Sequence, residues 1–258
     1  MTKIKIFDLK EQYKTISNEV NKNVLDILSS GQYILGKNLL KLEESFSKHV
    51  GSNYAIGCNS GTDALILSLR AMNIGPGDEV ITSPFSYFAT AEVIALTGAR
   101  PVFADINPHT YNINHKLIEK LITKKTKAII PVHLYGQACE ITEIRKICRK
   151  YNLTLIEDCA QSFGAKMNNQ FTGTFGQFGC FSFFPTKNLG CAGDGGMVVT
   201  NSLQKAKILK KLRNHGGLVR NKHEYVGYNS RLDEIQASIL LTKLKIINSI
   251  NKKRIKIA

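Results

Sequence analysis

The feature that most constrains the fold is an alternation of short apolar segments with segments of helical periodicity. Strands are predicted at YAIGC (54–58), EVITS (79–83), RPVFAD (100–105), KAIIPVH (127–133), LTLIED (153–158), GCFSFF (179–184) and GMVVT (196–200). Helices are predicted at Thr62–Asn73, Phe88–Thr97, His115–Ile122 and Ile141–Tyr151, after an N-terminal helix near Tyr13–Leu28 and a turn at SSGQYILG (29–36). Such alternation predicts an α/β fold with a largely parallel sheet covered by helices.

Polar residues directly follow three of these strands. Asp158 closes LTLIED, Ser60 to Thr62 follow YAIGC and open a helix, and Lys187 follows GCFSFF. Ligands of open α/β sheets bind beyond the carboxyl ends of the strands. We therefore expect these residues to face one pocket.

The segment Ser60–Gly61–Thr62 has the composition of an anion site. Free backbone N–H groups and the helix dipole favour a phosphate at such a helix N-terminus. Ser, Gly and Thr are also ordinary helix caps, so the segment alone does not separate the two interpretations.

Lys187 has unusual neighbours, because FSFFP (181–185) precedes it and GDGG (193–196) follows it. An apolar setting lowers the pKa of a lysine and frees its neutral amine to bind an aldehyde. A carboxylate such as Asp158 can hold the ring nitrogen of pyridoxal phosphate protonated. The pair predicts an enzyme that uses this cofactor, although a strand-end aspartate can also be a simple cap of the loop. Gln161 is placed to reach the phenolic oxygen of the ring, and Ser182 to add a hydroxyl to the phosphate site.

Tyr87 follows the second strand and could stack on a planar ring or pack in the core.

Several other chemistries are not supported by the sequence. The six histidines form no ligand cluster, so no metal is expected, and the glycines at 190, 193, 195 and 196 do not match GxGxxG. The six cysteines contain no CxxC pair and are expected to be buried free thiols.

The net charge of +15 is concentrated in one part of the chain. Residues 201–258 hold 14 Lys and Arg against 3 Asp and Glu, mainly in KAKILKKLRNHGG (205–217) and KLKIINSINKKRIKIA (243–258). Their helical spacing and few aromatics favour a solvated helix face over a nucleic-acid surface. The 258 residues contain no long apolar segment and the first residues are charged, so a cytoplasmic protein with no membrane partner is expected.

Seven motifs in this order strongly resemble the DegT/DnrJ/EryC1/StrS family of sugar aminotransferases. They are SGTDAL, GPGDEVIT, the run from TKAIIPVHLYGQ to IEDCAQSFGA, FSFFPTKNLG, GDGGMVVT, RNHG and GYNSRLDEIQA. The resemblance implies the aspartate aminotransferase fold (fold type I), with a mainly parallel seven-stranded sheet and a homodimer. It also implies pyridoxal phosphate bound to Lys187.

The resemblance assigns further residues to the cofactor site. Asp158 would hold the ring nitrogen beside Gln161, Tyr87 would stack on the ring, and Gly61, Thr62 and Ser182 would bind the phosphate. Asn229 of GYNSR would reach the phosphate from the partner subunit, and Arg231 is a candidate substrate contact.

The finer resemblance is to aminotransferases of UDP-linked 3-keto hexuronic acids. It implies transfer of an amino group, expected from glutamate, to a keto group of a nucleotide-linked sugar used in a surface polysaccharide or related glycan. The alternative is a non-catalytic regulator or interaction protein of the same fold. The expected division is a helical segment (1–30), a cofactor-binding domain (31–250) and the start of a C-terminal part (251–258), with most of the family's small domain missing.

Overall fold

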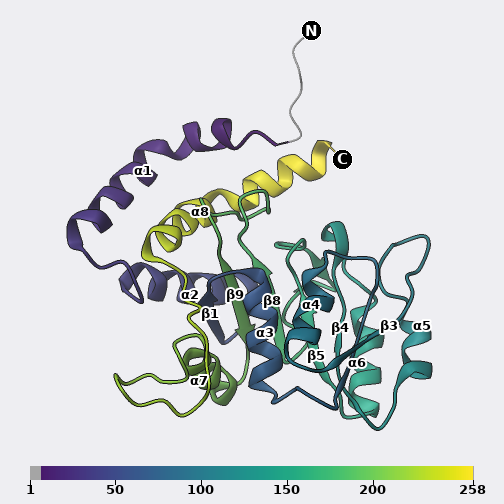
Figure 1. Cartoon of the computed structure of the whole chain (residues 1–258). Helices are drawn as coiled ribbons and strands as arrows, with labels where there is room; N and C mark the ends of the chain where they lie inside the picture. Colours follow the sequence, from purple (N-terminus) through teal and green to yellow (C-terminus); the bar gives the residue numbers. More distant parts are fainter. Residues whose placement is uncertain (1–6, 258) are drawn as a thin grey trace.

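The structure is a computed structural model that describes residues 7–257. Its centre is a seven-stranded sheet with the order β1-β9-β8-β5-β4-β2-β3 (Figure 1). The strands are β1 (Tyr54–Cys58), β2 (Glu79–Thr82), β3 (Arg100–Phe103), β4 (Thr126–Ile130), β5 (Thr154–Asp158), β8 (Phe178–Ser182) and β9 (Gly196–Thr200). All neighbouring strands pair in parallel except β9, which is antiparallel to both β1 and β8. The expectation of a mainly parallel sheet is confirmed.

The helices cover both faces of the sheet. They are α1 (Leu9–Ser30), α2 (Lys37–Val50), α3 (Gly61–Ala71), α4 (Ala89–Leu96), α5 (His115–Ile118), α6 (Ile141–Lys150), α7 (Leu203–Leu212) and α8 (Glu234–Ile257). Alternate strand residues face opposite layers: Ala128 and Ile130 pack with α3, α4 and α7, whereas Ile129 packs with α5 and α6. Both layers are apolar, which explains why the strands read as continuous apolar runs.

α2 and α8 cover the β1 end of the sheet, on the same face as α5 and α6. Leu39, Leu42 and Phe46 of α2 are fully buried there with Leu240 of α8. Glu234, the first residue of α8, accepts hydrogen bonds from the backbone N–H groups of 36, 38 and 39, and so caps α2 from outside that helix. α1 lies along α8 (Figure 1).

Most sequence-predicted elements are found, with some differences. The helix expected over His115–Ile122 ends at Ile118 and continues as a 3₁₀ turn, Glu119–Leu121. Two features were not predicted from the sequence: α2, and the small hairpin of β6 (Lys166–Met167) and β7 (Gln170–Phe171). All six cysteines are buried and free, as predicted. α8 crosses the expected boundary at residue 250 without a break.

Candidate active site

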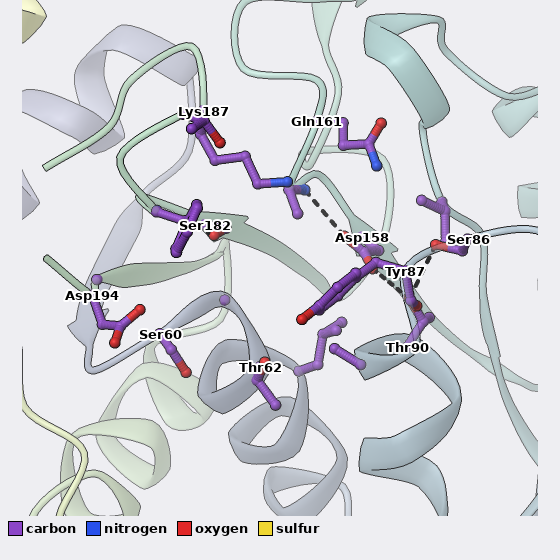
Figure 2. Close-up of a pocket in the computed structure, with 18 residues that line it drawn as sticks. Ser60, Thr62, Ser86, Tyr87, Thr90, Asp158, Gln161, Ser182, Lys187 and Asp194 are labelled. Atoms are coloured by element: carbon purple, nitrogen blue, oxygen red, sulfur yellow. Dashed lines mark hydrogen bonds between the residues drawn. The ribbon is translucent and has the colours of Figure 1, made fainter. Parts of the chain in front are cut away.

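A cavity of about 440 Å³ opens beyond the carboxyl ends of β1, β2, β5 and β8. The predicted site residues that line it are Gly61, Thr62, Tyr87, Asp158, Gln161, Ser182 and Lys187. Figure 2 shows the Lys187 side chain extending across the cavity toward the side that holds Asp158 and Gln161. The expectation that the strand-end residues share one pocket is confirmed.

The N-terminus of α3 forms one wall of the cavity. Ser60 caps this helix by accepting the N–H of Asp63 at 3.0 Å, while the N–H groups of Gly61 and Thr62 have no hydrogen-bond partner within residues 7–257. A Cβ on Gly61 would lie 2.6 Å from Cβ of Ser182, so only glycine lets the Ser182 hydroxyl approach the helix this closely. Free N–H groups beside a hydroxyl form a binding site for an anion.

Asp158 lies at the end of β5 and is 5% exposed. Its Oδ2 accepts the Thr90 hydroxyl at 2.8 Å, and its Oδ1 accepts the N–H of Ala160 at 3.0 Å. Burial raises the pKa of this carboxyl, and those two hydrogen bonds partly oppose the rise. Lys187 and His133 also lower its pKa but form no ion pair with it within residues 7–257, and a cationic ring nitrogen in the cavity would be such a partner.

A buried hydrogen-bond network lies behind Asp158. Glu157 accepts the ring Nε2–H of His133 at 3.0 Å and the backbone N–H groups of residues 173, 175 and 176. His133 Nδ1 accepts the N–H of Cys139, and the backbone N–H of His133 donates to the Asp158 carbonyl. Potential ligand atoms of His133, Glu157 and Cys159 lie within 4.8 Å of one another, close enough to share a metal ion. Because the histidine nitrogens and carboxylate oxygens are already hydrogen-bonded, we assign the network the structural role of fixing the end of β5.

Lys187 is half-buried in the loop between β8 and β9. Burial lowers the pKa of its amine, and the nearby Asp158 carboxylate partly offsets that effect. The loop turns tightly here, since a Cβ on Gly190 would lie 2.4 Å from the carbonyl oxygen of Pro185. A lysine in this setting can provide a neutral amine near neutral pH.

Gln161 and Tyr87 reach the cavity in different ways. Gln161 Oε1 accepts the N–H of Tyr135 at 2.9 Å, which leaves its amide nitrogen as the donor. Tyr87 is 75% exposed just before α4, and Figure 2 places its ring beside the cavity between Thr62 and Asp158. This exposure excludes the alternative that Tyr87 packs in the core.

Two predicted residues lie outside the cavity lining. Asn229 is exposed and forms an isolated β-bridge with Asn214. Arg231 donates to Oδ1 of Asn214 at 3.1 Å. The chain therefore does not bring either residue into its own pocket.

Thr90 and Asp194 line the cavity and were missed in the sequence. Thr90 is in the first turn of α4, three residues after Tyr87, so helical spacing from the tyrosine was the available signal. Asp194 belongs to the GDGG segment, in which the aspartate follows no predicted strand and so carries no local signal of a site.

The lining fits pyridoxal phosphate on three counts. The unpartnered N–H groups of α3 suit the phosphate, the buried Asp158 suits a protonated ring nitrogen, and the Lys187 amine suits the aldehyde. Fold and pocket together define a pyridoxal-phosphate-dependent enzyme of the aspartate aminotransferase fold type.

Comparison with known proteins gives the family. Residues 14–258 match the model of the DegT/DnrJ/EryC1/StrS aminotransferase family, and the chain belongs to this family. It is 47% identical over 243 residues to a UDP-2-acetamido-2-deoxy-3-oxo-D-glucuronate aminotransferase of Pseudomonas aeruginosa, covering 94% of this chain and 68% of that one. It is 46% identical to a pleiotropic regulatory protein of Geobacillus stearothermophilus, covering 93% and 64%.

Solved structures agree with this assignment. A DegT DnrJ EryC1 StrS aminotransferase from Brucella abortus superposes with a TM-score of 0.93 at 40% identity, covering 96% of this chain and 68% of that one. NtdA from Bacillus subtilis, with bound cofactor PMP, gives 0.90 at 32% identity, covering 96% and 57%. The chain thus spans 57% to 68% of the length of these relatives. No helix within residues 7–257 is long and apolar enough to cross a membrane.

Proposed function

We propose that the protein transfers an amino group from an amino-acid donor, expected to be glutamate, to the keto group of a nucleotide-linked sugar. The product would serve a surface polysaccharide or related glycan. The observation that carries the proposal is the cavity in which Lys187 and Asp158 face each other beside a free helix N-terminus.

Each site residue has a defined task in this reaction. Pyridoxal phosphate supplies an aldehyde and an electron-withdrawing ring, which stabilise negative charge at the substrate carbon. Asp158 would keep the ring nitrogen protonated, and Gly61, Thr62 and Ser182 would hold the phosphate. Lys187 would bind the aldehyde, and its half-buried amine would be the group that accepts and returns a proton.

The test of this proposal is cofactor attachment. The purified protein should bind added pyridoxal phosphate, and borohydride reduction should fix the cofactor to the peptide that contains Lys187. Lys187→Ala should abolish the attachment, whereas Lys245→Ala, which removes an exposed amine of α8, should not. A protein that binds no cofactor, or a K187A variant that binds it covalently as before, would contradict the proposal.

We propose a UDP-linked 3-keto sugar acid as the substrate. Arg231 lies outside the pocket of its own chain, so it would contact the carboxylate or phosphate of the substrate across a dimer interface. The activity of the Pseudomonas relative supports this choice. Turnover should be at least about tenfold faster with the UDP sugar acid than with its uncharged analogue, because an arginine–carboxylate pair is charge-assisted. Arg231→Gln should remove this difference, and equal rates in the unsubstituted protein would contradict it.

We also propose a homodimer in which Asn229 completes the pocket of the partner subunit. Tyr87, Phe88 and Phe184 are 75%, 70% and 50% exposed near the cavity, and apolar surface of this kind is commonly covered by association. Mixing K187A and N229A chains should restore activity, because one pocket of the mixed dimer contains both residues. Activity of N229A alone at the unsubstituted level would overturn the role of Asn229.

A second candidate is a regulator that binds nucleic acid or an acidic partner through the basic C-terminal segment. The name of the Geobacillus relative and the excess of 14 basic over 3 acidic residues in 201–258 favour it. It requires binding of duplex DNA, or of an acidic partner, that weakens steeply as salt rises. Binding that is absent or insensitive to salt would remove this candidate.

A further inference from the structure

The loop that carries Lys187, residues 183–195, is called the lysine loop. Two hydrogen bonds join its backbone to side chains of α8. Lys243 Nζ donates to the carbonyl oxygen of Gly190 at 2.6 Å. Gln236 Oε1 accepts the backbone N–H of Ala192 at 2.8 Å. Both bonds hold the backbone of the loop, so they fix its course whatever its side chains are.

A third side chain of α8, Asn251, contacts the loops of both cofactor residues. Its Oδ1 accepts the side-chain amide of Asn188, next to Lys187, at 3.3 Å. Its Nδ2 donates to the carbonyl oxygen of Phe163, in the loop that follows Asp158, at 3.3 Å. One side chain therefore links the two loops.

We call these three side chains the clamp residues: Gln236, Lys243 and Asn251. They recur at intervals of seven and eight positions and so share one face of α8. Leu240 and Ile247 lie between them, buried in the same apolar cluster as Leu189 and Cys191 of the lysine loop. Polar and apolar contacts thus alternate along α8 and along the lysine loop.

Partial burial of the Lys243 amine costs free energy. The side chain is half-buried, and burial lowers the pKa of its amine. A surface lysine on the same helix, Lys245, instead pairs with Glu19 in solvent. The contact with the lysine loop explains why a basic residue lies on the inner face of α8.

We propose that the clamp residues are positioning residues for Lys187. They fix residues 188–192, which keeps the amine of Lys187 half-buried and directed at Asp158. This inference rests on the proposed role of Lys187 as the amine that binds the cofactor. The long lysine stem has many rotamers, so a mobile loop would raise the entropy lost when the amine is bound.

The experiment compares Lys243→Met, Gln236→Leu and the double variant with the unsubstituted protein. Lys243→Arg tests rescue, because its guanidinium also donates, and Lys245→Met is the matched control for loss of one charge from α8. On cofactor-free protein, hydrogen exchange of residues 188–192 and the pH dependence of Lys187 acylation are measured. Pyridoxal phosphate affinity is then measured by titration.

In K243M and Q236L, exchange at 188–192 should accelerate about tenfold or more, while α3 is unchanged. The pKa of Lys187 should rise toward its ordinary value, and cofactor affinity should fall about tenfold, with the largest effects in the double variant. K243R should recover most of the lost cofactor affinity. The exchange rate and the affinity of K245M should stay within about twofold of those of the unsubstituted protein.

Two results would overturn the proposal. One is an unchanged exchange rate and cofactor affinity in the double variant. The other is lower thermal stability with unchanged Lys187 titration and affinity, which would mean a structural role only. If the unsubstituted protein binds no pyridoxal phosphate, the proposed function fails, but exchange and titration still decide whether the clamp positions Lys187.

Discussion

Thr90 shows how one hydroxyl can set the chemistry of a buried carboxylate. It is 1% exposed, and its Oγ1 lies 2.8 Å from Oδ2 of Asp158. Ala160 donates to the other oxygen, so each carboxylate oxygen has one donor from the protein. Hydrogen bonds to the charged form favour ionisation, which is the state that a protonated ring nitrogen requires.

Thr90→Val should therefore weaken cofactor binding. Losing the donor raises the pKa of Asp158 further, so the acid limb of the pH profile of binding should move to higher pH. Affinity at neutral pH should fall about tenfold, the size expected for one bond to a charged group. Thr90→Ser, which keeps the hydroxyl, is the control. A valine variant whose affinity and pH profile both match the serine variant would contradict this account.

Asp158 should also lower the stability of the cofactor-free protein. Its pKa is raised by burial, so the folded state keeps the proton to a higher pH than the unfolded chain does. Stability is therefore lost as the pH rises from the ordinary carboxyl pKa through the folded one. Asp158→Asn removes this loss and should raise the melting temperature at neutral pH by about 2–4 °C, roughly 1 kcal/mol for a chain of this size.

The difference in melting temperature between D158N and the unsubstituted protein is measured from acid to neutral pH. Glu19 and Glu79, whose pKa values are lowered by hydrogen bonds to Lys245 and Arg100, affect stability with the opposite sign, but they cancel in the difference. The difference should grow with pH and then level off. A difference that is constant or shrinks would show that Asp158 is not destabilising.

At the scale of elements, α2 depends on a residue distant in sequence. Its N-cap, Gly36, offers no side chain, and the carboxylate of Glu234 accepts four hydrogen bonds in its place, three from the backbone and one from the Asn38 amide. Glu234 is 1% exposed, so no water can replace it. The junction between α2 and α8 thus rests on one buried charge.

Glu234→Gln should lower the free energy of unfolding by about 2–4 kcal/mol, because an amide leaves buried donors unsatisfied. Glu44→Gln is the matched control on α2: Glu44 pairs with Lys48 in solvent, and its loss should change stability by less than about 0.5 kcal/mol. Urea denaturation measures both. Equal effects of the two substitutions would refute the capping role.

The elements show which parts of the fold could be predicted from sequence. Both faces of the sheet are buried, so its strands appear as apolar runs and all seven were found. α2 was not predicted, although its sequence carries the signal of a helix, because Leu39, Leu42, Phe46 and Val50 recur at helical spacing. The role of Glu234 could not be predicted, since it depends on a contact over almost 200 residues.

At the scale of the whole molecule, bound cofactor should stabilise the fold. The cavity is formed by loops after four strands and exists only in the folded chain. Pyridoxal phosphate at about 100 times its dissociation constant should add about 2.7 kcal/mol by mass action. Thermal unfolding should show this increase, and K187A should show much less of it at the same concentration. No increase with the unsubstituted protein would contradict a folded-state site.

The convergence of site residues was predictable, but their fine geometry was not. The rule that ligands bind at the carboxyl ends of parallel strands placed Lys187, Asp158 and Thr62 in one cavity. The rule concerns strands only, so it does not predict Thr90, which lies on a helix, or the clamp residues of α8. Such residues act through tertiary contacts that have no local signature.

The attachment of the lysine loop to α8 also bears on synthesis at the ribosome. A nascent chain that has emerged only as far as Asp158 contains the buried acid but neither β8, which pairs with β5, nor the loop that carries Lys187. Asn251, which joins the two loops, emerges later still. A domain generally folds as a unit during translation, so a cofactor pocket that is ordered by residues as late as Asn251 is a late product of synthesis.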